Sequence, residues 1–195
     1  MTTSQIQIQR TLTSDQRHAA AGILYAAFER KLRPMLGSKR AVSYIETALV
    51  PERCIVAIEQ HEVVGIIGLQ YDGKPSQQAS LRTSVSRLGL FRGLLAVVMQ
   101  EGTHRRPDEK ELYIEALAVK VDQRGRGIGT RLLQEALALG SELGKERITL
   151  EVIDTNPDAY RLYVRLGFSC IRTRRYPFTQ QMMGFRSVGL MQREL

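Results

Sequence analysis

Asp-Gln-Arg-Gly-Arg-Gly-Ile-Gly-Thr, residues 122–130, is a glycine-rich loop that follows a predicted strand at 112–121 and leads into a predicted helix at 129–143. Its glycines let the backbone turn sharply and bring N–H groups close to a ligand without interference from Cβ atoms. The start of the helix adds free N–H donors and the positive end of the helix dipole. Arg124 and Arg126 add formal charge. The loop therefore predicts a phosphate-binding site, although a glycine turn that simply leads into a helix has the same local pattern.

The type of phosphate ligand is narrowed by two motifs that the loop does not match. Thr130 stands where the dinucleotide fingerprint Gly-x-Gly-x-x-Gly has its third glycine. The sequence Gly-Lys-Ser/Thr, which holds phosphates in nucleoside triphosphatases, occurs nowhere in the chain. A dinucleotide and a hydrolysed nucleoside triphosphate are therefore both disfavoured as ligands.

The rest of the chain alternates between strand and helix patterns, which are read from apolar residues at every second position or at every third and fourth position. The order is β-α-α-β-β-insert-β-α-β-α-β-β, with Ser14 as the N-cap of the first helix and the last strand at an edge. This order predicts one α/β domain over residues 1–195, with a mixed sheet and helices on both of its faces. The predicted strands are 5–9, 54–59, 63–71, 112–121, 147–153, 168–174 and 185–193, and the predicted helices are 15–30, 38–49, 129–143 and 156–166.

The stretch 76–110 lies between the third and fourth predicted strands and is predicted to be a helical insert. Leu81, Val85 and Leu88 have helical spacing, which is typical of an amphipathic helix that covers a core. A helix that lies on a membrane surface has the same pattern, so this alternative stays open.

A second motif, Asn-Pro-Asp-Ala-Tyr-Arg-Leu-Tyr-Val-Arg-Leu-Gly-Phe at 156–168, predicts a short helix with well-marked ends. Asn156 is a favourable N-cap, Pro157 suits the first turn, and Gly167 suits the position after the last turn. Tyr163 shares the apolar face of this helix with Ala159, Leu162 and Leu166. Packing for its apolar bulk would explain this tyrosine without any chemistry.

Together the two motifs resemble those of the GNAT acetyltransferases. Residues 124–129 fit the family's Gln/Arg-x-x-Gly-x-Gly/Ala signature, and residues 156–168 are similar to its Asn-x-x-Ala-x-x-Leu-Tyr-x-x-x-Gly-Phe segment. Residues 113–119, Tyr-Ile-Glu-Ala-Leu-Ala-Val, look like the family's fourth strand, and the specific resemblance covers about residues 112–174. The resemblance implies a mixed, mostly antiparallel central sheet and transfer of an acetyl group from acetyl-CoA to an amine.

The resemblance also implies roles in cofactor binding. The loop would hold the pyrophosphate of acetyl-CoA. Leu117, Ala118 and Val119 would line the pantetheine arm, and backbone groups of Leu117 and Val119 would pair with it in a gap between strands 112–121 and 147–153. Asn156 would help to hold the cofactor or the backbone beside it. The loop residues given this role are Arg124, Gly125, Arg126, Gly127, Ile128, Gly129 and Thr130.

Tyr163 and Glu115 are the predicted catalytic residues. In the family, the tyrosine that matches Tyr163 gives a proton to the departing coenzyme A thiolate, which suits a phenol with a pKa of about 10. Glu115 is the candidate base for the acceptor amine, because the family often has an acid there and a carboxylate in an apolar strand is costly unless it is paired. Because the side chains of a strand alternate between its two faces, Glu115 is predicted to share a face with Leu117 and with Tyr113. Tyr113 is the second candidate for the base. A salt bridge or an open, solvated position would explain Glu115 without catalysis.

Composition sets expectations about partners and location. A net charge of +8 suits a phosphate-rich partner, but the chain has no helix-turn-helix, zinc or base-stacking signature of a nucleic-acid-binding protein. Cys54 and Cys170 are expected to be buried, unpaired thiols, and the scattered histidines lack the cysteine partners of a metal site. We find no apolar run of the roughly 20 residues that span a bilayer and no secretory signal, so a cytoplasmic location is expected.

The sequence thus predicts direct acetyl transfer without a covalent enzyme intermediate, because no cysteine lies in either motif. A coenzyme-A-binding sensor or regulatory module without a working acid and base is the alternative. The acceptor stays open among small amines, antibiotics, amino acids and proteins. We expect the insert, with the connections 31–37 and 176–184, to shape acceptor choice, its run 88–99 serving as a wall or lid. Strand 185–193 offers pairing between subunits in a homodimer.

Overall fold

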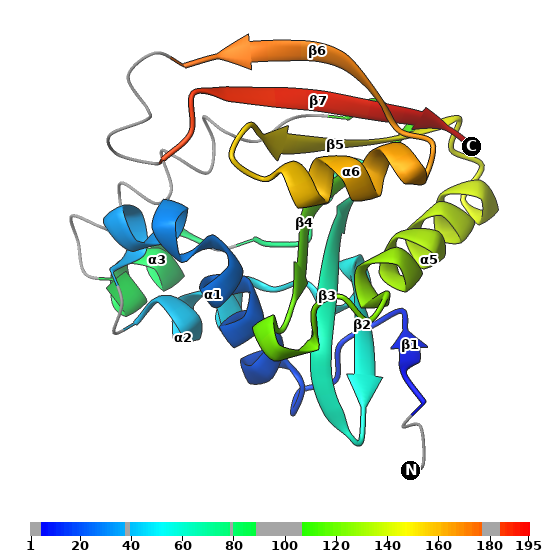
Figure 1. Cartoon of the computed structure of the whole chain (residues 1–195). Coiled ribbons are helices and arrows are strands. Elements are labelled where there is room, and N and C mark those ends of the chain that lie inside the picture. Colours follow the sequence, from blue (N-terminus) through cyan, green and yellow to red (C-terminus); the bar gives the residue numbers. More distant parts are fainter. Residues whose placement is uncertain (1–4, 38–39, 79, 89–106, 177–183) are drawn as a thin grey trace.

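The computed structural model describes residues 5–37, 40–78, 80–88, 107–176 and 184–195, whose arrangement is shown in Figure 1. The described strands form one sheet in the order β1-β2-β3-β4-β5-β7-β6. Neighbouring strands are antiparallel except β4 and β5, which are parallel. This is the mixed, mostly antiparallel sheet that the sequence predicts. The strands are β1 (Gln7–Gln9), β2 (Cys54–Glu59), β3 (Glu62–Gln70), β4 (Glu111–Val119), β5 (Arg147–Ile153), β6 (Ser169–Arg175) and β7 (Ser187–Glu194).

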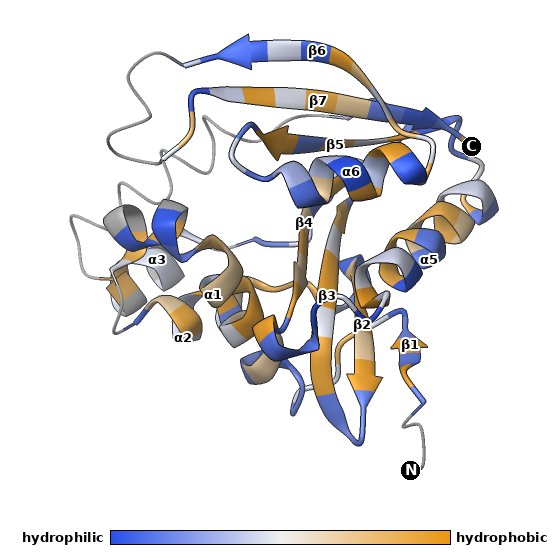
Figure 2. Cartoon of the chain, viewed as in Figure 1, coloured by the Kyte–Doolittle hydropathy of each residue, from blue (hydrophilic) through white to orange (hydrophobic). Residues whose placement is uncertain are grey.

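Helices cover both faces of the sheet, as Figure 1 shows. α5 (Ile128–Glu142) and α6 (Pro157–Arg165) pack on one face in a first apolar layer. α1 (Arg17–Leu36), α2 (Ala41–Ala48) and α3 (Leu81–Leu88) belong to a second layer on the opposite face. Figure 2 shows hydrophobic residues along the central strands and on the helix faces turned toward them. The two layers hold the elements on which the candidate site depends.

A bulge in β4 interrupts its pairing with β3. Gly68 of β3 pairs with Ala116, but the next residue, Leu69, pairs with Ile114. Glu115 is therefore an extra residue of β4 without a partner on β3. Bulges of this kind redirect side chains and are frequent next to functional sites.

The bulge also changes which layer the side chains of β4 enter. Leu112, before the bulge, belongs to the layer of α5 and α6, whereas Ala118, after it, belongs to the layer of α1 and α2. Glu115 consequently lies on the α1 face with Tyr113, while Leu117 packs against the α5 layer. The expectation that Leu117 shares a face with Glu115 is wrong, because the extra residue breaks the period of two.

The last strand does not have the predicted position. β7 lies between β5 and β6, so it is not an edge strand and offers no free side for pairing between subunits. The edge is β6, whose residues are all exposed and include Arg172, Arg174 and Arg175. Charged side chains suit an exposed edge because they discourage further pairing. The same strand carries Cys170, which is exposed rather than buried as expected, while Cys54 is buried, and both are free.

The first helix also differs from its prediction. α1 begins after an N-cap at Gln16, without a side-chain capping bond, so Ser14 is not its cap. It continues past Pro34, with a kink at Phe28 where the backbone leaves helical geometry. α1 has 20 residues, yet neither it nor any other helix in the described ranges is long and apolar enough to cross a membrane.

The described part of the insert packs on the α1 face. β3 and β4 are antiparallel neighbours, as predicted, so the insert leaves the sheet at the end opposite to the loop 122–130. The hydroxyl groups of Tyr44 in α2 and Ser84 in α3 are 3.3 Å apart, and Leu88 is buried in the α1 layer. Beyond Leu88, the predicted wall or lid at 88–99 lies outside the described residues.

Candidate functional site

The sheet opens between β4 and β5. These strands pair only over residues 111–114 and 147–150. Beyond this point β5 stays paired with β7 to its end, while β4 continues along β3 to Val119. The two strands therefore diverge into a gap, and Glu115 is the first residue of β4 past its closed end.

Backbone groups of β4 point into this gap. The N–H of Lys120 donates to the carbonyl oxygen of Val64 on β3 at 2.9 Å. Because hydrogen-bonded and non-hydrogen-bonded positions alternate in an antiparallel pair, Leu117 and Val119 direct their N–H and C=O groups away from β3. β5 does not pair with them. The gap thus presents strand-type donors and acceptors to an extended ligand.

The glycine-rich loop leaves the start of α5 without a side-chain cap. Gly125 and Gly127 both have a φ of 77°, a left-handed conformation that favours glycine, and a Cβ at either position would meet no atom within 4 Å. Gly127 is the N-cap of α5, and the first helical bond runs from the Arg131 N–H to its carbonyl oxygen. The N–H groups of the first turn thus have no side-chain cap from Gly127, and N–H groups of this kind can bind an anion.

The two loop arginines have different partners. Arg126 forms two hydrogen bonds of 2.7 Å to the carboxylate of Glu59 and a further bond to Gln123. Its charge is thereby balanced within the protein, and the carboxylate raises the pKa of Arg126 further above its ordinary value. Arg124 is exposed, and its Nε donates to the Val119 carbonyl oxygen at 3.3 Å. Of these two, Arg124 is the one left to meet a phosphate.

The loop, the gap and α6 meet at Gly129. A Cβ at this glycine would lie 3.4 Å from the side chain of Leu162 in α6 and 3.9 Å from that of Val119 in β4. Asn156 holds the start of α6, because its side-chain oxygen accepts a hydrogen bond from the Ala159 N–H at 3.2 Å. The predicted cap is therefore present, and it fixes the helix that carries Tyr163.

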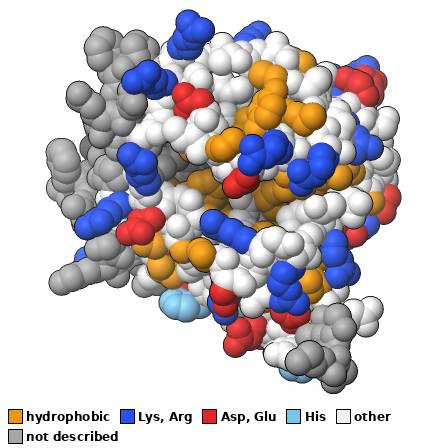
Figure 3. All heavy atoms as spheres, viewed as in Figure 1, with side chains coloured by type: hydrophobic (Ala, Val, Ile, Leu, Met, Phe, Trp, Pro, Cys, Tyr) orange, Lys and Arg blue, Asp and Glu red, His pale blue; other side chains and the backbone are white. Residues whose placement is uncertain are grey.

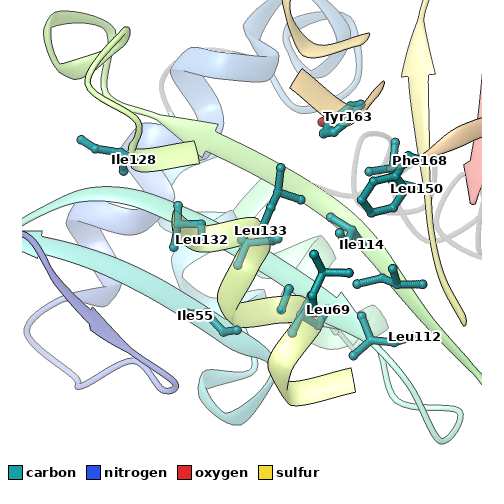
Figure 4. Packing of buried hydrophobic residues seen from close by; sticks show 14 of the residues in the cluster. Ile55, Leu69, Leu112, Ile114, Ile128, Leu132, Leu133, Leu150, Tyr163 and Phe168 are labelled. Carbon is teal, nitrogen blue, oxygen red and sulfur yellow. The ribbon is translucent and has the colours of Figure 1, made fainter. Parts of the chain in front are cut away.

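Tyr163 is buried in the α5 layer with only 7% of its surface exposed. Its ring is tilted against that of Phe168 with a centroid distance of 6.0 Å. Figure 4 shows its oxygen pointing away from Phe168 and Leu150. Burial raises the pKa of the hydroxyl to about 12. The group is therefore a protonated phenol at neutral pH, as a proton donor must be.

Glu115 has a partner that the sequence did not indicate. Its carboxylate accepts hydrogen bonds from the backbone N–H and the hydroxyl of Ser76, both at 2.5 Å. Ser76 is buried just before α3 and packs over Gly68, where a Cβ would collide with its hydroxyl. These contacts fix the carboxylate on the α1 face, whereas Tyr163 belongs to the opposite layer.

Ser76 and Glu59 are therefore site-related residues that the sequence interpretation missed. Ser76 lies 39 positions before Glu115, and Glu59 lies 67 positions before Arg126. Neither belongs to a local motif. Only the pairing of β2, β3 and β4 brings each one to its partner.

The surface over the gap is hollowed. Figure 3 shows a depression in the middle of this face, with hydrophobic side chains inside and Lys and Arg side chains around it. A separate pocket of about 750 Å³ lies between α1 and the end of β4, where Ile23 and Ala26 face Val119, Lys120 and Arg124. It borders the loop but includes neither Tyr163 nor Glu115.

Cys54, the buried cysteine, is unsuited to nucleophilic chemistry. Burial, reinforced by the charge of Glu115, raises the pKa of the Cys54 thiol to about 12, which makes it a poor nucleophile. Among the described residues, no group of three or more His, Cys, Asp or Glu side chains could hold a metal ion.

The chain is similar in sequence to known acetyltransferases. Residues 22–168 match a family model described as "Acetyltransferase (GNAT) family". The chain is 40% identical over 79 residues to the N-alpha-acetyltransferase MAK3 of Arabidopsis thaliana, which is 40% of each chain. It is 36% identical over 83 residues to N-alpha-acetyltransferase 30 of Schizosaccharomyces pombe, covering 43% of this chain and 54% of that protein. The chain thus spans about half or less of the length of these curated relatives.

The fold comparison covers nearly the whole chain. The crystal structure of an N-acetyltransferase from Staphylococcus aureus Mu50 superimposes with a TM-score of 0.66 and 20% identity. The match covers 96% of this chain and 100% of that one. At this identity the likeness establishes the fold.

Proposed function

Because the chain belongs to the GNAT acetyltransferase family, we propose that it moves an acetyl group from acetyl-CoA directly to a primary amine. The observation that carries this proposal is the meeting of three features around one gap. These are the start of α5 without a side-chain cap, the part of β4 that does not pair with β5, and the buried phenol of Tyr163. A phosphate site, a strand-like channel and a proton donor are the parts that this reaction requires.

The geometry of the loop and gap suits a coenzyme A thioester. The free N–H groups after Gly127, with Arg124 beside them, would hold the pyrophosphate. The backbone of Leu117 and Val119 would pair with the amide-containing pantetheine arm as a neighbouring strand does. One of these N–H groups would also stabilise the negative charge that develops on the thioester oxygen during transfer.

The acid and base would act from opposite faces of the sheet. The amine nitrogen attacks the thioester carbonyl carbon, so that an N–C bond forms and the C–S bond breaks. Glu115 takes a proton from the amine, directly or through a water molecule, and Tyr163 gives its proton to the departing sulfur. Solvent then restores both side chains to their starting protonation states. A primary amine with a pKa near 10 needs such a base at neutral pH.

Alpha-amines are the first acceptors to test, because the names of the two curated relatives identify them as N-alpha-acetyltransferases. The similarity to them covers less than half of this chain. The insert before β4 would help to set the acceptor, because it leaves the sheet at the end opposite to the loop. We therefore propose primary amines in general as the acceptor class.

The proposal is tested by measuring acetyl-CoA binding by calorimetry and coenzyme A release with a panel of primary amines. Tyr163→Phe should reduce the turnover number on the order of 100-fold with acetyl-CoA affinity unchanged, because it removes only the proton donor. Tyr160→Phe is the matched control, since Tyr160 lies on the same helix but is 43% exposed. A wild-type protein that binds acetyl-CoA but releases no coenzyme A with any amine would instead be a sensor.

A further inference from the structure

A buried side-chain oxygen without a partner lies close to Glu115. Gln70 is the last residue of β3 and is only 4% exposed. No donor from the described part of the chain reaches its Oε1 atom. Buried polar atoms are almost always hydrogen-bonded in folded proteins, so an unpaired one requires an explanation. A ligand that supplies the missing donor is one such explanation.

The strand pairing places Gln70 on the face of the sheet that carries Glu115. Leu69 points into the α5 layer, so Gln70, the next residue, points to the α1 face. Gly68, two residues earlier, points to Ser76, the partner of Glu115. Gln70 pairs directly with Tyr113 on β4, and Glu115 follows two residues along the same face. The oxygen and the carboxylate are therefore neighbours on one surface.

Two carboxylates, those of Glu115 and Glu111, lie near Gln70 on this face. Glu111 precedes Tyr113 on the same face and is buried, with its carboxylate accepting a hydrogen bond from the Thr149 hydroxyl. The nearest basic residue on β5, Arg147, is engaged in an ion pair with Asp108. The atom shown to lack a partner is the amide oxygen of Gln70, and it requires a ligand that brings a hydrogen-bond donor.

We infer that Gln70 is a specificity-determining residue of the acceptor site, and this inference rests on the proposed acetyl transfer. Its Oε1 atom accepts a hydrogen bond from an N–H group that the acceptor carries near its reacting amine. Directly opposed residues of two strands have Cβ atoms about 5 Å apart, and diagonal neighbours about 7 Å. The recognised N–H group thus lies about two to four covalent bonds from the reacting nitrogen.

Two kinds of acceptor carry such a group, and both offer the same chemistry. One is a peptide, whose first backbone N–H follows its terminal amine. The other is a short diamine, whose second nitrogen is an ammonium group. Each has a counterpart of the same shape without the donor. A depsipeptide replaces the first peptide N–H by an ester oxygen, and butylamine replaces one nitrogen of 1,3-diaminopropane by a methyl group.

The test compares kcat/KM for the two pairs in the wild-type protein, in Gln70→Met and in Gln134→Met. Gln134 is an exposed glutamine on α5 and serves as the matched control. Wild-type protein and the control should prefer the N–H-bearing member of one pair by roughly 10- to 100-fold, because an unpaired buried polar group rejects the other member. Gln70→Met should remove this preference, mainly by raising KM for that member. The pair that shows it identifies the acceptor as peptide or diamine.

Further measurements separate this role from a structural one. Gln70→Met should leave the acetyl-CoA affinity and the thermal midpoint unchanged or raised, because it replaces an unsatisfied acceptor by an apolar isostere. Gln70→Glu retains acceptor oxygens and should retain the preference. If Gln70→Met lowered kcat/KM equally for both members of a pair, the inference would be overturned. It would also be overturned if the wild-type protein preferred neither member of either pair. If the protein bound acetyl-CoA but released no coenzyme A in the presence of any of the four amines, the proposed function itself would be contradicted.

Discussion

Tyr163 illustrates how packing alone can prepare a side chain for one proton transfer. Its hydroxyl lies in an apolar layer between α6 and the sheet, with Phe168 beside the ring. An ionised phenolate would lose its hydration there, which is why burial raises the pKa to about 12. The side chain can therefore donate a proton to a thiolate and still recover it from solvent at neutral pH.

The raised pKa of Tyr163 predicts a loss of stability at alkaline pH. Below pH 10 the hydroxyl is protonated in both the folded and the unfolded chain. Between about pH 10 and pH 12 the unfolded chain ionises first, so the free energy of unfolding should fall by about 3 kcal/mol. Tyr163→Phe should lack this part of the loss. The difference between the two denaturation profiles is the measurement, because Cys54 titrates in the same range in both proteins.

Equal alkaline slopes in wild type and Tyr163→Phe would contradict this assignment. They would mean that the hydroxyl reaches solvent well enough to ionise at its ordinary pKa. The phenol would then be partly ionised at the alkaline end of the activity profile and would no longer be a dependable proton donor there.

Glu115→Gln tests the proposed base. Glutamine keeps the size of the side chain and can still accept the Ser76 N–H, so the fold should be preserved. The rate at pH 7 should fall on the order of 100-fold or more, and the loss should shrink as the pH rises through the pKa of the amine, about 8 for an alpha-amine and about 10 for a lysine-type amine. A pH–rate profile of both proteins checks this. A loss of the same size at every pH would show that Glu115 positions groups without taking a proton.

At the scale of elements, the start of α5 is the part of the site that depends on backbone conformation. Gly127→Glu should lower acetyl-CoA affinity by roughly 100-fold or more, because it places a carboxylate among the N–H groups that would meet the pyrophosphate. The left-handed backbone at this position, φ 77°, also costs a non-glycine residue about 1–2 kcal/mol. Calorimetry on the folded variant measures the affinity.

Gly144→Glu is the control for the conformational cost. Gly144 has a φ of 67° and open space around its Cβ position, and it lies in the turn after α5. It should lose a similar amount of stability while acetyl-CoA affinity is retained. If both variants lost affinity to the same extent, strain rather than charge would be the cause and the loop would not be a phosphate site.

The elements were largely predictable because their signals are local. β2 and β5 occupy the predicted residues, and the loop with its flanking strand and helix is where the glycines and the apolar stripe indicate. The bulge at Glu115 could not be predicted. Apolar residues at 112, 114, 116 and 118 keep an unbroken period of two in the sequence, although the extra residue sends the two halves into different layers.

At the scale of the whole molecule, the order of the strands was only partly predictable. The antiparallel neighbours β3 and β4 follow from their family resemblance, but nothing local in β7 indicates that it enters between β5 and β6. That placement matters for the site. β5 pairs with β7 along its full length, including the residues beyond 150 that do not pair with β4.

The two ends of the gap separate the tasks of cofactor binding and acceptor choice. The loop lies after β4, whereas the insert joins the end of β3 to the start of β4. α3, the described part of the insert, packs on the face that carries Glu115 and Gln70. A substrate that reaches Glu115 from this side would pass the insert, and acetyl-CoA would enter from the loop. Changes in the insert should therefore affect the kinetics with the acceptor and leave the binding of acetyl-CoA unchanged.

Replacing residues 89–106 by a Gly/Ser segment of the same length tests this division. Ser76 and α3 are retained, so the contacts of Glu115 and the packing of Leu88 should persist. Acceptor kcat/KM should fall roughly 10- to 100-fold, because positioning of the amine is lost, while acetyl-CoA affinity stays within error. Calorimetry and coenzyme A release measure the two quantities on one preparation. Unchanged acceptor kinetics would show that the acceptor does not meet the insert, and a loss of acetyl-CoA binding would show that the two ends of the gap are not independent.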